Sequence, residues 1–162
     1  MATGTILLPL KWPHFDRTNP PGLNVDNPEN RMAFDDTASE IVRIIIRAPD
    51  DYASGFVLKG FIPMAGANTG TKVVGVGVAV DAKASGESIG SESFDTENTT
   101  EITINNTAET IVSFSLTLTN ADSVNAGERM VLKFRRITTG LTGTNAVGDA
   151  LMEATTLEYT TT

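Results

Sequence analysis

The sequence predicts an antiparallel β-sandwich or a related β-barrel, and three observations support this fold class. Apolar and polar residues alternate with a period of two in most apolar segments. No segment has a convincing helical period: "FDDTASEIVRI" runs directly into β-branched residues, and "TNAVGDALMEA" has room for one short turn. Turn residues separate the strand candidates at intervals of about 8–12 residues, which is the spacing typical of sandwiches.

The clearest strands lie between Ser113 and Arg136. In "IVSFSLTLT" the apolar side chains fall on one face and the hydroxyl side chains on the other. In "RMVLKFRR" the inward positions are Met130, Leu132 and Phe134, whereas Lys133 and Arg135 point outward. The intervening "NADSVNAGE" is rich in turn residues. We therefore expect a hairpin, or a corner between two packed sheets.

The same pattern predicts the remaining strands, which are Thr5–Lys11, Met32–Asp35, Ile41–Ala48, Gly55–Pro63, Lys72–Ala82, Glu101–Ile104 and Ala150–Thr161. The β-branched run "IVRIIIRA" is nearly continuous, which favours a central strand covered on both faces, with its second face apolar at one end and solvated at Arg43 and Arg47. In "VVGVGVAV" one face consists of valines, and Gly75 and Gly77 leave the other face flat. Such a face allows close approach by the chain's own arm or loop, or by a neighbouring subunit. A phosphate-binding loop is disfavoured, because no helix follows.

The chain divides into an extended, proline-rich N-terminal arm at residues 1–30 and a single sandwich domain at residues 31–162. The prolines at 13, 20, 21 and 28 disfavour helix and ladder in the arm. Trp12 and Phe15 are aromatic, so we expect the arm to be ordered against the sandwich or a neighbour. Residues 82–100 form a Ser-, Gly- and Glu-rich loop, which should be exposed and mobile, with Phe94 holding it down.

Composition excludes several classes of partner. The chain has 162 residues, 12 Lys and Arg against 20 Asp and Glu, and a net charge of −8. An acidic surface repels phosphate backbones, so nucleic acid is not expected as a partner; the best candidate for a local basic patch is Lys133 with Arg135 and Arg136. No apolar run is long enough for a membrane helix, and the first residues do not resemble an export signal. The sequence has no cysteine, so disulfides and thiolate metal sites are excluded.

No catalytic constellation is evident. His14 is the only histidine, it lies in the proline-rich arm, and no G-x-S-x-G motif accompanies it. We therefore predict no catalytic residue, no metal ligand and no cofactor. The carboxylate clusters at 35–36, 50–51 and 95–97 are solvated loop charges or a weak calcium site, and none matches a known calcium loop. Tyr52, in "DDYASG", either packs over the sandwich edge or offers an exposed platform for a ligand.

Several segments resemble a family of small virion proteins of tailed bacteriophages. These are "YASGFVLKGFIPMA", "LTNADSVNAGERMVLKFRR" and "GDALMEATTLEYTT", with "GTILLPL" and "AFDDTASE" in the same order. The resemblance implies a jelly-roll-like sandwich, self-association as a homotrimer, and docking onto the major capsid protein at the outer surface of a virion assembled in the host cytoplasm. It brings no catalytic residue.

The resulting hypothesis is a non-enzymatic capsid decoration protein that bridges capsomers and stabilises the shell by mass action. Its contacts would come from the arm and from the flat glycine face, namely Trp12, Pro13, Phe15, Pro20, Pro21, Gly75 and Gly77. The alternative hypothesis is a fibre-head or receptor-binding module that recognises glycan through Tyr52 and the loop at 82–100.

Overall fold

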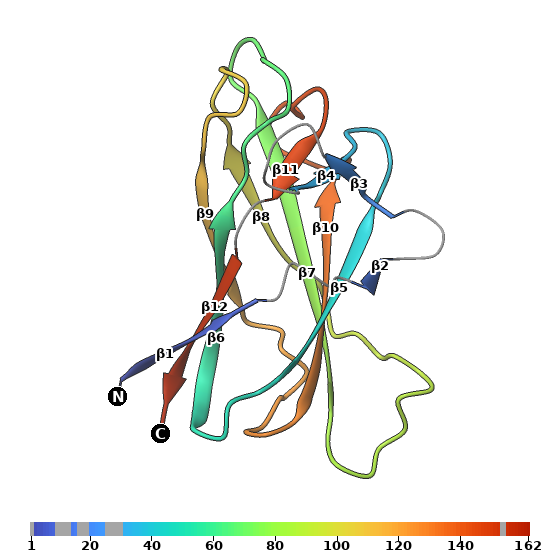
Figure 1. Ribbon diagram of the computed structural model, residues 1–162, viewed down its shortest axis with the longest axis vertical. Coiled ribbons are helices and arrows are strands. Elements are labelled where there is room, and N and C mark those ends of the chain that lie inside the picture. Colours follow the sequence, from blue (N-terminus) through green and yellow to red (C-terminus); the bar gives the residue numbers. More distant parts are fainter. Residues whose placement is uncertain (1, 9–13, 16–19, 25–30, 153–154) are drawn as a thin grey trace.

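The computed structural model describes residues 2–8, 14–15, 20–24, 31–152 and 155–162, and every regular element in these residues is a β-strand. Figure 1 shows two larger sheets that pack face to face, with a small third sheet near one end. All pairings between strands are antiparallel. The predicted antiparallel sandwich is thus confirmed. The described residues contain no helix that could span a membrane.

The first sheet brings the two ends of the described chain side by side (Figure 1). Its strands, in order across the sheet, are β1 (Thr3–Leu7), β12 (Thr155–Thr161), β6 (Tyr52–Phe61) and β9 (Ser113–Leu118). β1 pairs with β12 from Thr3 opposite Thr160 to Leu7 opposite Thr156. The opening residues are therefore a strand of the sandwich.

The second sheet has five strands, which are β2 (His14–Phe15), β5 (Ile41–Arg47), β10 (Arg129–Ile137), β7 (Val73–Lys83) and β8 (Asn98–Thr103). β9 belongs to the first sheet and β10 to the second, so the segment from Ser113 to Arg136 forms a corner rather than a hairpin. β7 is buried from Val73 to Asp81. β5 lies between β2 and β10, as expected of a central strand; Val42 and Ile44 are buried, but Ile45 on the other face is 38% exposed, so that face is covered only in part.

The third sheet consists of β11 (Ala150–Met152), β4 (Arg31–Phe34) and β3 (Gly22–Asn24). The predicted single strand at Ala150–Thr161 is therefore two strands in different sheets. Phe34 of β4 packs edge-on against Phe134 of β10, with ring centroids 5.4 Å apart. Through this contact the small sheet packs against the main core.

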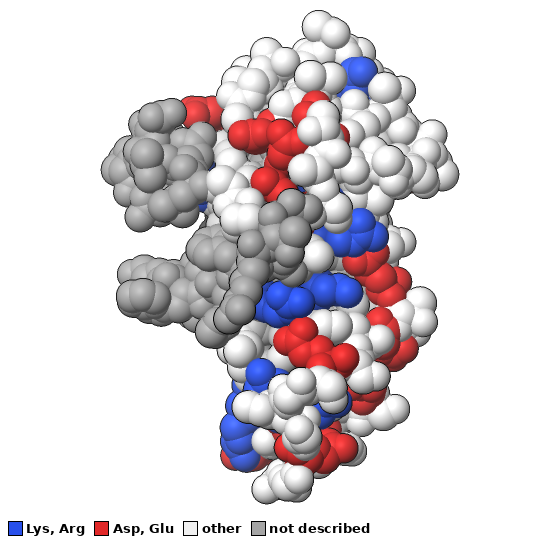
Figure 2. All heavy atoms as spheres, turned by 90° about the vertical axis from the view of Figure 1, so that its right-hand side faces the viewer, with Lys and Arg blue, Asp and Glu red and all other residues white. Residues whose placement is uncertain are grey.

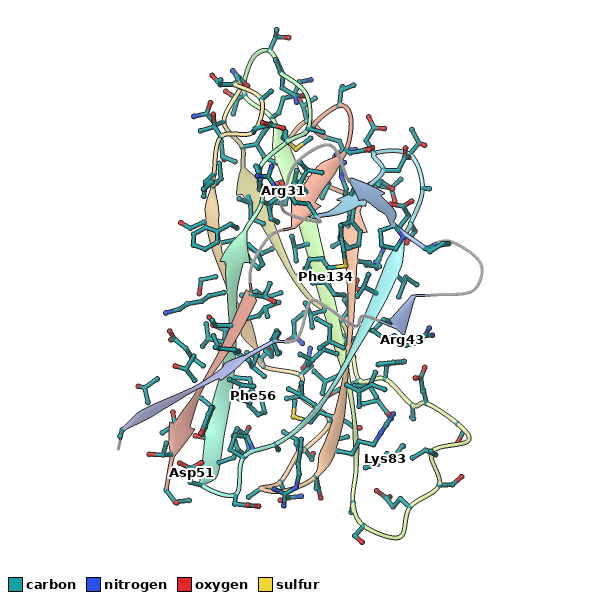
Figure 3. All side chains as sticks on the ribbon, viewed as in Figure 1. Arg31, Arg43, Asp51, Phe56, Lys83 and Phe134 are labelled. Atoms are coloured by element: carbon teal, nitrogen blue, oxygen red, sulfur yellow. The ribbon has the colours of Figure 1, made fainter. Side chains whose placement is uncertain are left out.

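The core fills the space between the two large sheets. Phe56 of the first sheet and Phe134 of the second, both labelled in Figure 3, are 0% and 4% exposed. They join a continuous cluster of buried aliphatic side chains from every long strand. Burial of this apolar surface is the main force that holds the layers together.

The described parts of residues 1–30 add one strand to each sheet, and the domain boundary at residue 30 stays a prediction.

Candidate functional site

The outer face of the first sheet carries mainly hydroxyl groups. Strand alternation sends Leu58, Leu116 and Leu157 into the core and their neighbours outward. We call the outward set the hydroxyl face; its residues are Thr3, Thr5, Leu7, Val57, Lys59, Phe61, Ser113, Ser115, Thr117, Thr156, Glu158 and Thr160. Seven of these twelve side chains are Ser or Thr, so the face offers many groups that both donate and accept hydrogen bonds.

A groove of about 550 Å³ lies at one end of the hydroxyl face. Its lining comes from three neighbouring strands and consists of Lys59, Gly60, Phe61, Ser113, Phe114, Ser115 and Thr156. The strand register explains this grouping, because Phe61 lies opposite Ser113, and Lys59 lies between Ser115 and Thr156. The groove is within the size range of small-ligand sites.

Phe61 is the aromatic residue of the groove. It is 40% exposed, more than any other aromatic side chain whose burial the structure describes. The other aromatic side chains of known burial are half-buried or lie in the core. An exposed ring flanked by hydroxyl groups combines an apolar surface with hydrogen-bonding partners, which is the composition of many ligand sites.

The groove is electrically almost neutral. Lys59 Nζ lies 2.7 Å from Glu158 Oε2, so the two charges of the hydroxyl face compensate each other. The other groove residues are uncharged. This neutrality contrasts with the net charge of −8 on the whole chain.

The outer face of the second sheet is different, because residues 84–97 cover part of it. Lys133 Nζ lies 4.5 Å from the centroid of the Phe94 ring, and Arg135 Nη2 lies 2.6 Å from Glu97 Oε2. Figure 2 shows positive and negative side chains interspersed on this side of the molecule. The basic patch considered from the sequence does not form, since Arg136 points inward and is 2% exposed.

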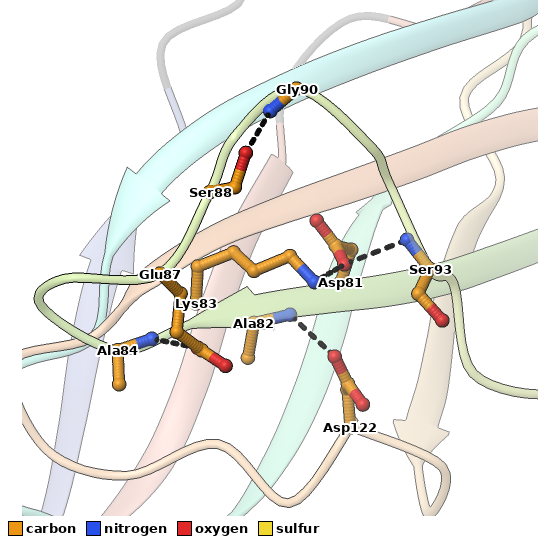
Figure 4. Close-up of polar contacts among 9 residues, drawn as sticks. All are labelled: Asp81, Ala82, Lys83, Ala84, Glu87, Ser88, Gly90, Ser93 and Asp122. Carbon is orange, nitrogen blue, oxygen red and sulfur yellow. Dashed lines mark hydrogen bonds and ion pairs between the residues drawn. The ribbon is translucent and has the colours of Figure 1, made fainter.

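Hydrogen bonds fasten this loop to the end of β7 (Figure 4). Asp81 Oδ1 accepts a hydrogen bond from Ser93 N at 3.0 Å and lies 3.1 Å from Lys83 Nζ. The hydrogen bond to Asp81 raises the pKa of Lys83. On the neighbouring residue, Ala82 N donates to Asp122 Oδ2 at 2.7 Å. The expected contact of Phe94 with the sheet is present, and the ligand role suggested for this loop stays untested.

The flat face of Gly75 and Gly77 is filled by the chain itself. A Cβ on Gly75 would lie 2.5 Å from the Leu141 side chain, and a Cβ on Gly77 would lie 2.6 Å from Glu97. Both glycines are buried. The structure therefore agrees with packing by the chain's own loops, and these residues present no surface to a neighbouring subunit or a capsid.

Tyr52 packs over the edge of the sandwich. Its ring stacks on Phe56, with centroids 4.3 Å apart and an interplanar angle of 11°, and the side chain is half-buried. Burial raises the pKa of its hydroxyl. Tyr52 and Phe61 lie at opposite ends of β6, about 30 Å apart along the strand. The structure thus does not bring Tyr52 into the groove.

The remaining predicted contact residues fall mainly in the arm. Trp12 and Pro13 lie outside the described residues. His14 and Phe15 form β2, and their side chains are likewise not described. Pro20 is exposed and Pro21 is buried. No group of three potential metal ligands occurs in the described part of the chain; Asp35 in one carboxylate cluster accepts hydrogen bonds from Thr37 and Ala38, which lower its pKa.

Sequence reasoning did not single out Phe61, although a signal was present. In "FVLKGF" the residues Phe56, Leu58 and Gly60 share one phase of the alternation, and Phe61 shares the other phase with the charged Lys59. An aromatic residue in phase with an outward lysine points to solvent. The exposure itself depends on the absence of a covering layer, which the local pattern does not contain.

Comparison with known proteins identifies similar folds. No protein-family model and no curated protein matches the chain. A solved CBM35 module from Cellvibrio japonicus Abf62 matches at 8% identity over 95% of this chain and 92% of that chain, with a TM-score of 0.50. The carbohydrate-binding module TmCBM27, described for specific mannan recognition, matches at 8% identity over 92% and 84%, with a TM-score of 0.42.

A third structure is the CBM22-1 and GH10 modules of Clostridium thermocellum xylanase 10B complexed with xylohexaose. It matches at 14% identity over 90% of this chain and 28% of that chain, with a TM-score of 0.37. At such identities, the match to CBM35 shows a common jelly-roll-like β-sandwich fold. All three of these structures contain a carbohydrate-binding module, and none of the three is a phage protein. This finding overturns the hypothesis of a capsid decoration protein; the phage resemblance, the homotrimer and the virion location have no support here.

Proposed function

We propose that this chain is a non-catalytic carbohydrate-binding module that holds a neutral glycan in the groove beside Phe61. The observation that carries the proposal is one exposed aromatic ring in a hydroxyl-lined groove on an otherwise regular sheet. Sugar rings have an apolar face of C–H groups and a rim of hydroxyls. Phe61 matches the apolar face, and Ser113, Ser115 and Thr156 match the rim.

The charges in the groove and on the whole chain favour a neutral ligand. Lys59 is compensated by Glu158 at 2.7 Å, so the groove has no free cation for a uronate or a sulfate. The net charge of −8 also repels anionic polysaccharides at long range. An uncharged polysaccharide needs no cation in the groove and is not repelled by the net charge.

The same residues support binding without hydrolysis. Glycoside hydrolysis ordinarily uses two carboxylates across the scissile bond. The hydroxyl face carries one carboxylate, Glu158, and that group is engaged by Lys59. Retention of the ligand without turnover is the expected behaviour.

Affinity electrophoresis in gels that contain soluble mannan, xylan or mixed-linkage β-glucan tests the proposal. At least one of these neutral polysaccharides should retard the wild-type chain, and polygalacturonate should not. Phe61→Ala should weaken binding about 30-fold, since loss of a central aromatic contact costs about 2 kcal/mol.

Two variants serve as controls. Ile45→Ala removes a side chain of similar exposure, 38%, from the outer face of the other sheet, and should leave retardation unchanged. Tyr52→Ala should also retain binding, because Tyr52 lies at the far end of β6. Loss of binding in Tyr52→Ala with retention in Phe61→Ala would place the ligand at the other end of the sheet and refute the assignment of the groove.

A further inference from the structure

The outer edge of β1 has backbone groups that point away from its sheet. Ala2 O accepts a hydrogen bond from Thr161 N at 3.0 Å, and Leu8 N donates to Thr155 O at 3.2 Å. Because hydrogen bonding alternates along an antiparallel strand, the residues between them with odd numbers direct their N–H and C=O groups to the opposite edge. These residues are Thr3, Thr5 and Leu7. Within the described residues no strand pairs with this edge.

The other edge strand of the first sheet, β9, pairs with no further strand, but the second sheet lies close to it. β9 lies beside β8 of the second sheet, and the Asn98 side chain of β8 bridges to the end of β9. Asn98 Nδ2 donates to Asn120 O at 2.8 Å, and Asn120 N donates to Asn98 Oδ1 at 2.9 Å. In the first sheet, β1 is thus the edge strand without a neighbour in the described chain (Figure 1).

β1 also lacks the features that normally prevent edge-to-edge pairing. Edge strands are commonly protected by lysine, proline, a bulge or an inward charge. The strand "TGTIL" has none of these residues, and its pairing with β12 is regular from Thr3 to Leu7. β1 itself carries no charge, so it is a surface at which two copies of the chain can meet although each has a net charge of −8 and they repel each other overall.

We propose that β1 pairs antiparallel with β1 of a second copy, about a two-fold axis at Thr5. In this register Thr5 lies opposite Thr5, and Thr3 lies opposite Leu7. Thr3, Thr5 and Leu7 are the residues whose N–H and C=O groups point away from β12. Each of the facing pairs can therefore form two backbone hydrogen bonds, as in a hydrogen-bonded pair of an antiparallel sheet. The interface is isologous, and the two first sheets become one continuous sheet.

The side chains of β1 fit this register. Leu7 is 79% exposed, the most exposed large hydrophobic side chain in the described residues, and it would pack over Thr3 of the second copy. On the inner face, the partly buried Ile6 would lie opposite Gly4, which is covered by the Tyr159 ring of its own chain. Aliphatic contact across the pair adds to the backbone hydrogen bonds.

The two-fold axis is perpendicular to the sheet, so both hydroxyl faces lie on the same side of the dimer. If the proposed function holds, one extended polysaccharide can contact two grooves, and binding gains from avidity. The pairing itself does not depend on glycan binding, and the tests below use no glycan.

Single cysteines give a direct test, because the chain has no cysteine of its own. In the proposed register two copies of Thr5→Cys have Cα atoms about 5.5 Å apart, which is within disulfide range. Mild oxidation, or a short thiol-reactive linker, should convert Thr5→Cys to a covalent dimer. Thr3→Cys alone and Leu7→Cys alone should give little dimer, but a mixture of these two variants should cross-link. Ile89→Cys, in a loop and 70% exposed, measures random collision.

Light scattering on the uncross-linked protein is the second measurement. The wild type should be a dimer whose fraction rises with concentration. Leu7→Lys should raise the dimer dissociation constant about tenfold or more without unfolding the monomer, since this side chain is already exposed, and Ile89→Lys should have no effect. A wild-type chain that stays monomeric at about 100 µM, or Thr5→Cys that cross-links no faster than Ile89→Cys, refutes the pairing.

Discussion

Arg136 holds together the end of the sandwich at which β10, β4 and the loop before β11 meet. Its guanidinium is 2% exposed and donates to Phe34 O at 3.0 Å, Gly148 O at 2.6 Å and Ala146 O at 2.6 Å. Burial lowers its pKa from the ordinary arginine value, and nearby carboxylates such as Asp36 oppose that shift. The side chain thereby ties β10 to β4 and to the loop before β11, and it replaces the water that these carbonyls would otherwise bind.

Arg136→Lys should lower the free energy of unfolding by about 3 kcal/mol. Lysine keeps the charge, but its single ammonium cannot reach oxygens on several sides, and buried carbonyls are left without donors. Urea unfolding measures the change. The neighbouring Arg135→Lys is the matched control: its partly exposed ion pair with Glu97 should be worth at most about 1 kcal/mol. Equal losses in the two variants would contradict this role for Arg136.

Glu101 gives stability a specific dependence on pH. Its carboxylate accepts hydrogen bonds from Thr142 N at 2.6 Å and Gly143 N at 2.9 Å, and these backbone donors lower its pKa. A carboxyl whose folded pKa is lowered stabilises the fold above its ordinary pKa of about 4.3. That contribution disappears as the pH falls through the lower, folded value.

Glu101→Gln should therefore lower the melting temperature at pH 7, and the difference from the wild type should shrink as the pH falls from about 5 toward 3. Calorimetric melts across this range measure the effect. Glu109→Gln, an exposed change in the loop between β8 and β9, is the control and should leave the wild-type pH profile intact. A constant difference for Glu101→Gln across the range would exclude the proposed linkage.

At the scale of elements, β1 is held by the fit between Gly4 and Tyr159 of β12. A Cβ on Gly4 would lie 2.1 Å from the Tyr159 ring, which is itself anchored by a hydrogen bond from its hydroxyl to Asp51 Oδ1 at 3.0 Å. The ring can cover the strand because residue 4 has no side chain. The edge strand thus stays in register without a charged or proline residue.

Gly4→Val should displace β1 and destabilise the chain by about 1–3 kcal/mol, because the new side chain overlaps a ring that is fixed at both ends. Hydrogen exchange of residues 3–7 should accelerate more than exchange in β7. Gly66→Ala is a suitable control, since a Cβ there meets no atom within 4 Å. Unchanged protection of β1 in Gly4→Val would mean that Tyr159 moves aside at little cost.

Most strands could be predicted from the sequence, because alternation is a local property. The corner between β9 and β10 follows from two such patterns and the turn between them. The solvent exposure of the outer face of β5 could not be predicted in the same way, since a β-branched run does not determine whether another layer packs on it. Arg136 shares the inward phase of Phe134, but a charge is seldom fully buried, and its carbonyl partners come from distant segments.

The candidate site was predicted less well, for a related reason. Tyr52 was selected because it lies in a turn-like loop, whereas in the structure it stacks on Phe56 where the register between β6 and β12 is irregular. Phe61 faces solvent because its side chain points outward from β6 beside Ser113 of β9, and no loop folds over it in the described structure. Sheet order and loop placement decide both cases, and neither is encoded in a short motif.

At the scale of the whole molecule, the two sheets have different outer faces. The second sheet is partly covered by residues 84–97 and carries charges that pair with one another, whereas the first presents open hydroxyl groups, one exposed ring and a compensated ion pair. Stability is concentrated between the sheets and around β7. We therefore propose that ligand binds to the first sheet, at the end that carries Phe61.

The most direct test is an NMR titration of the amide-labelled chain with a neutral oligosaccharide of the class that retards it in gels. Shifted amides should cluster at residues 59–61, 113–115 and 156, with little change at Tyr52 or in residues 84–97. Perturbations centred on those latter residues, or none with any neutral ligand tested, would contradict the assignment of the groove.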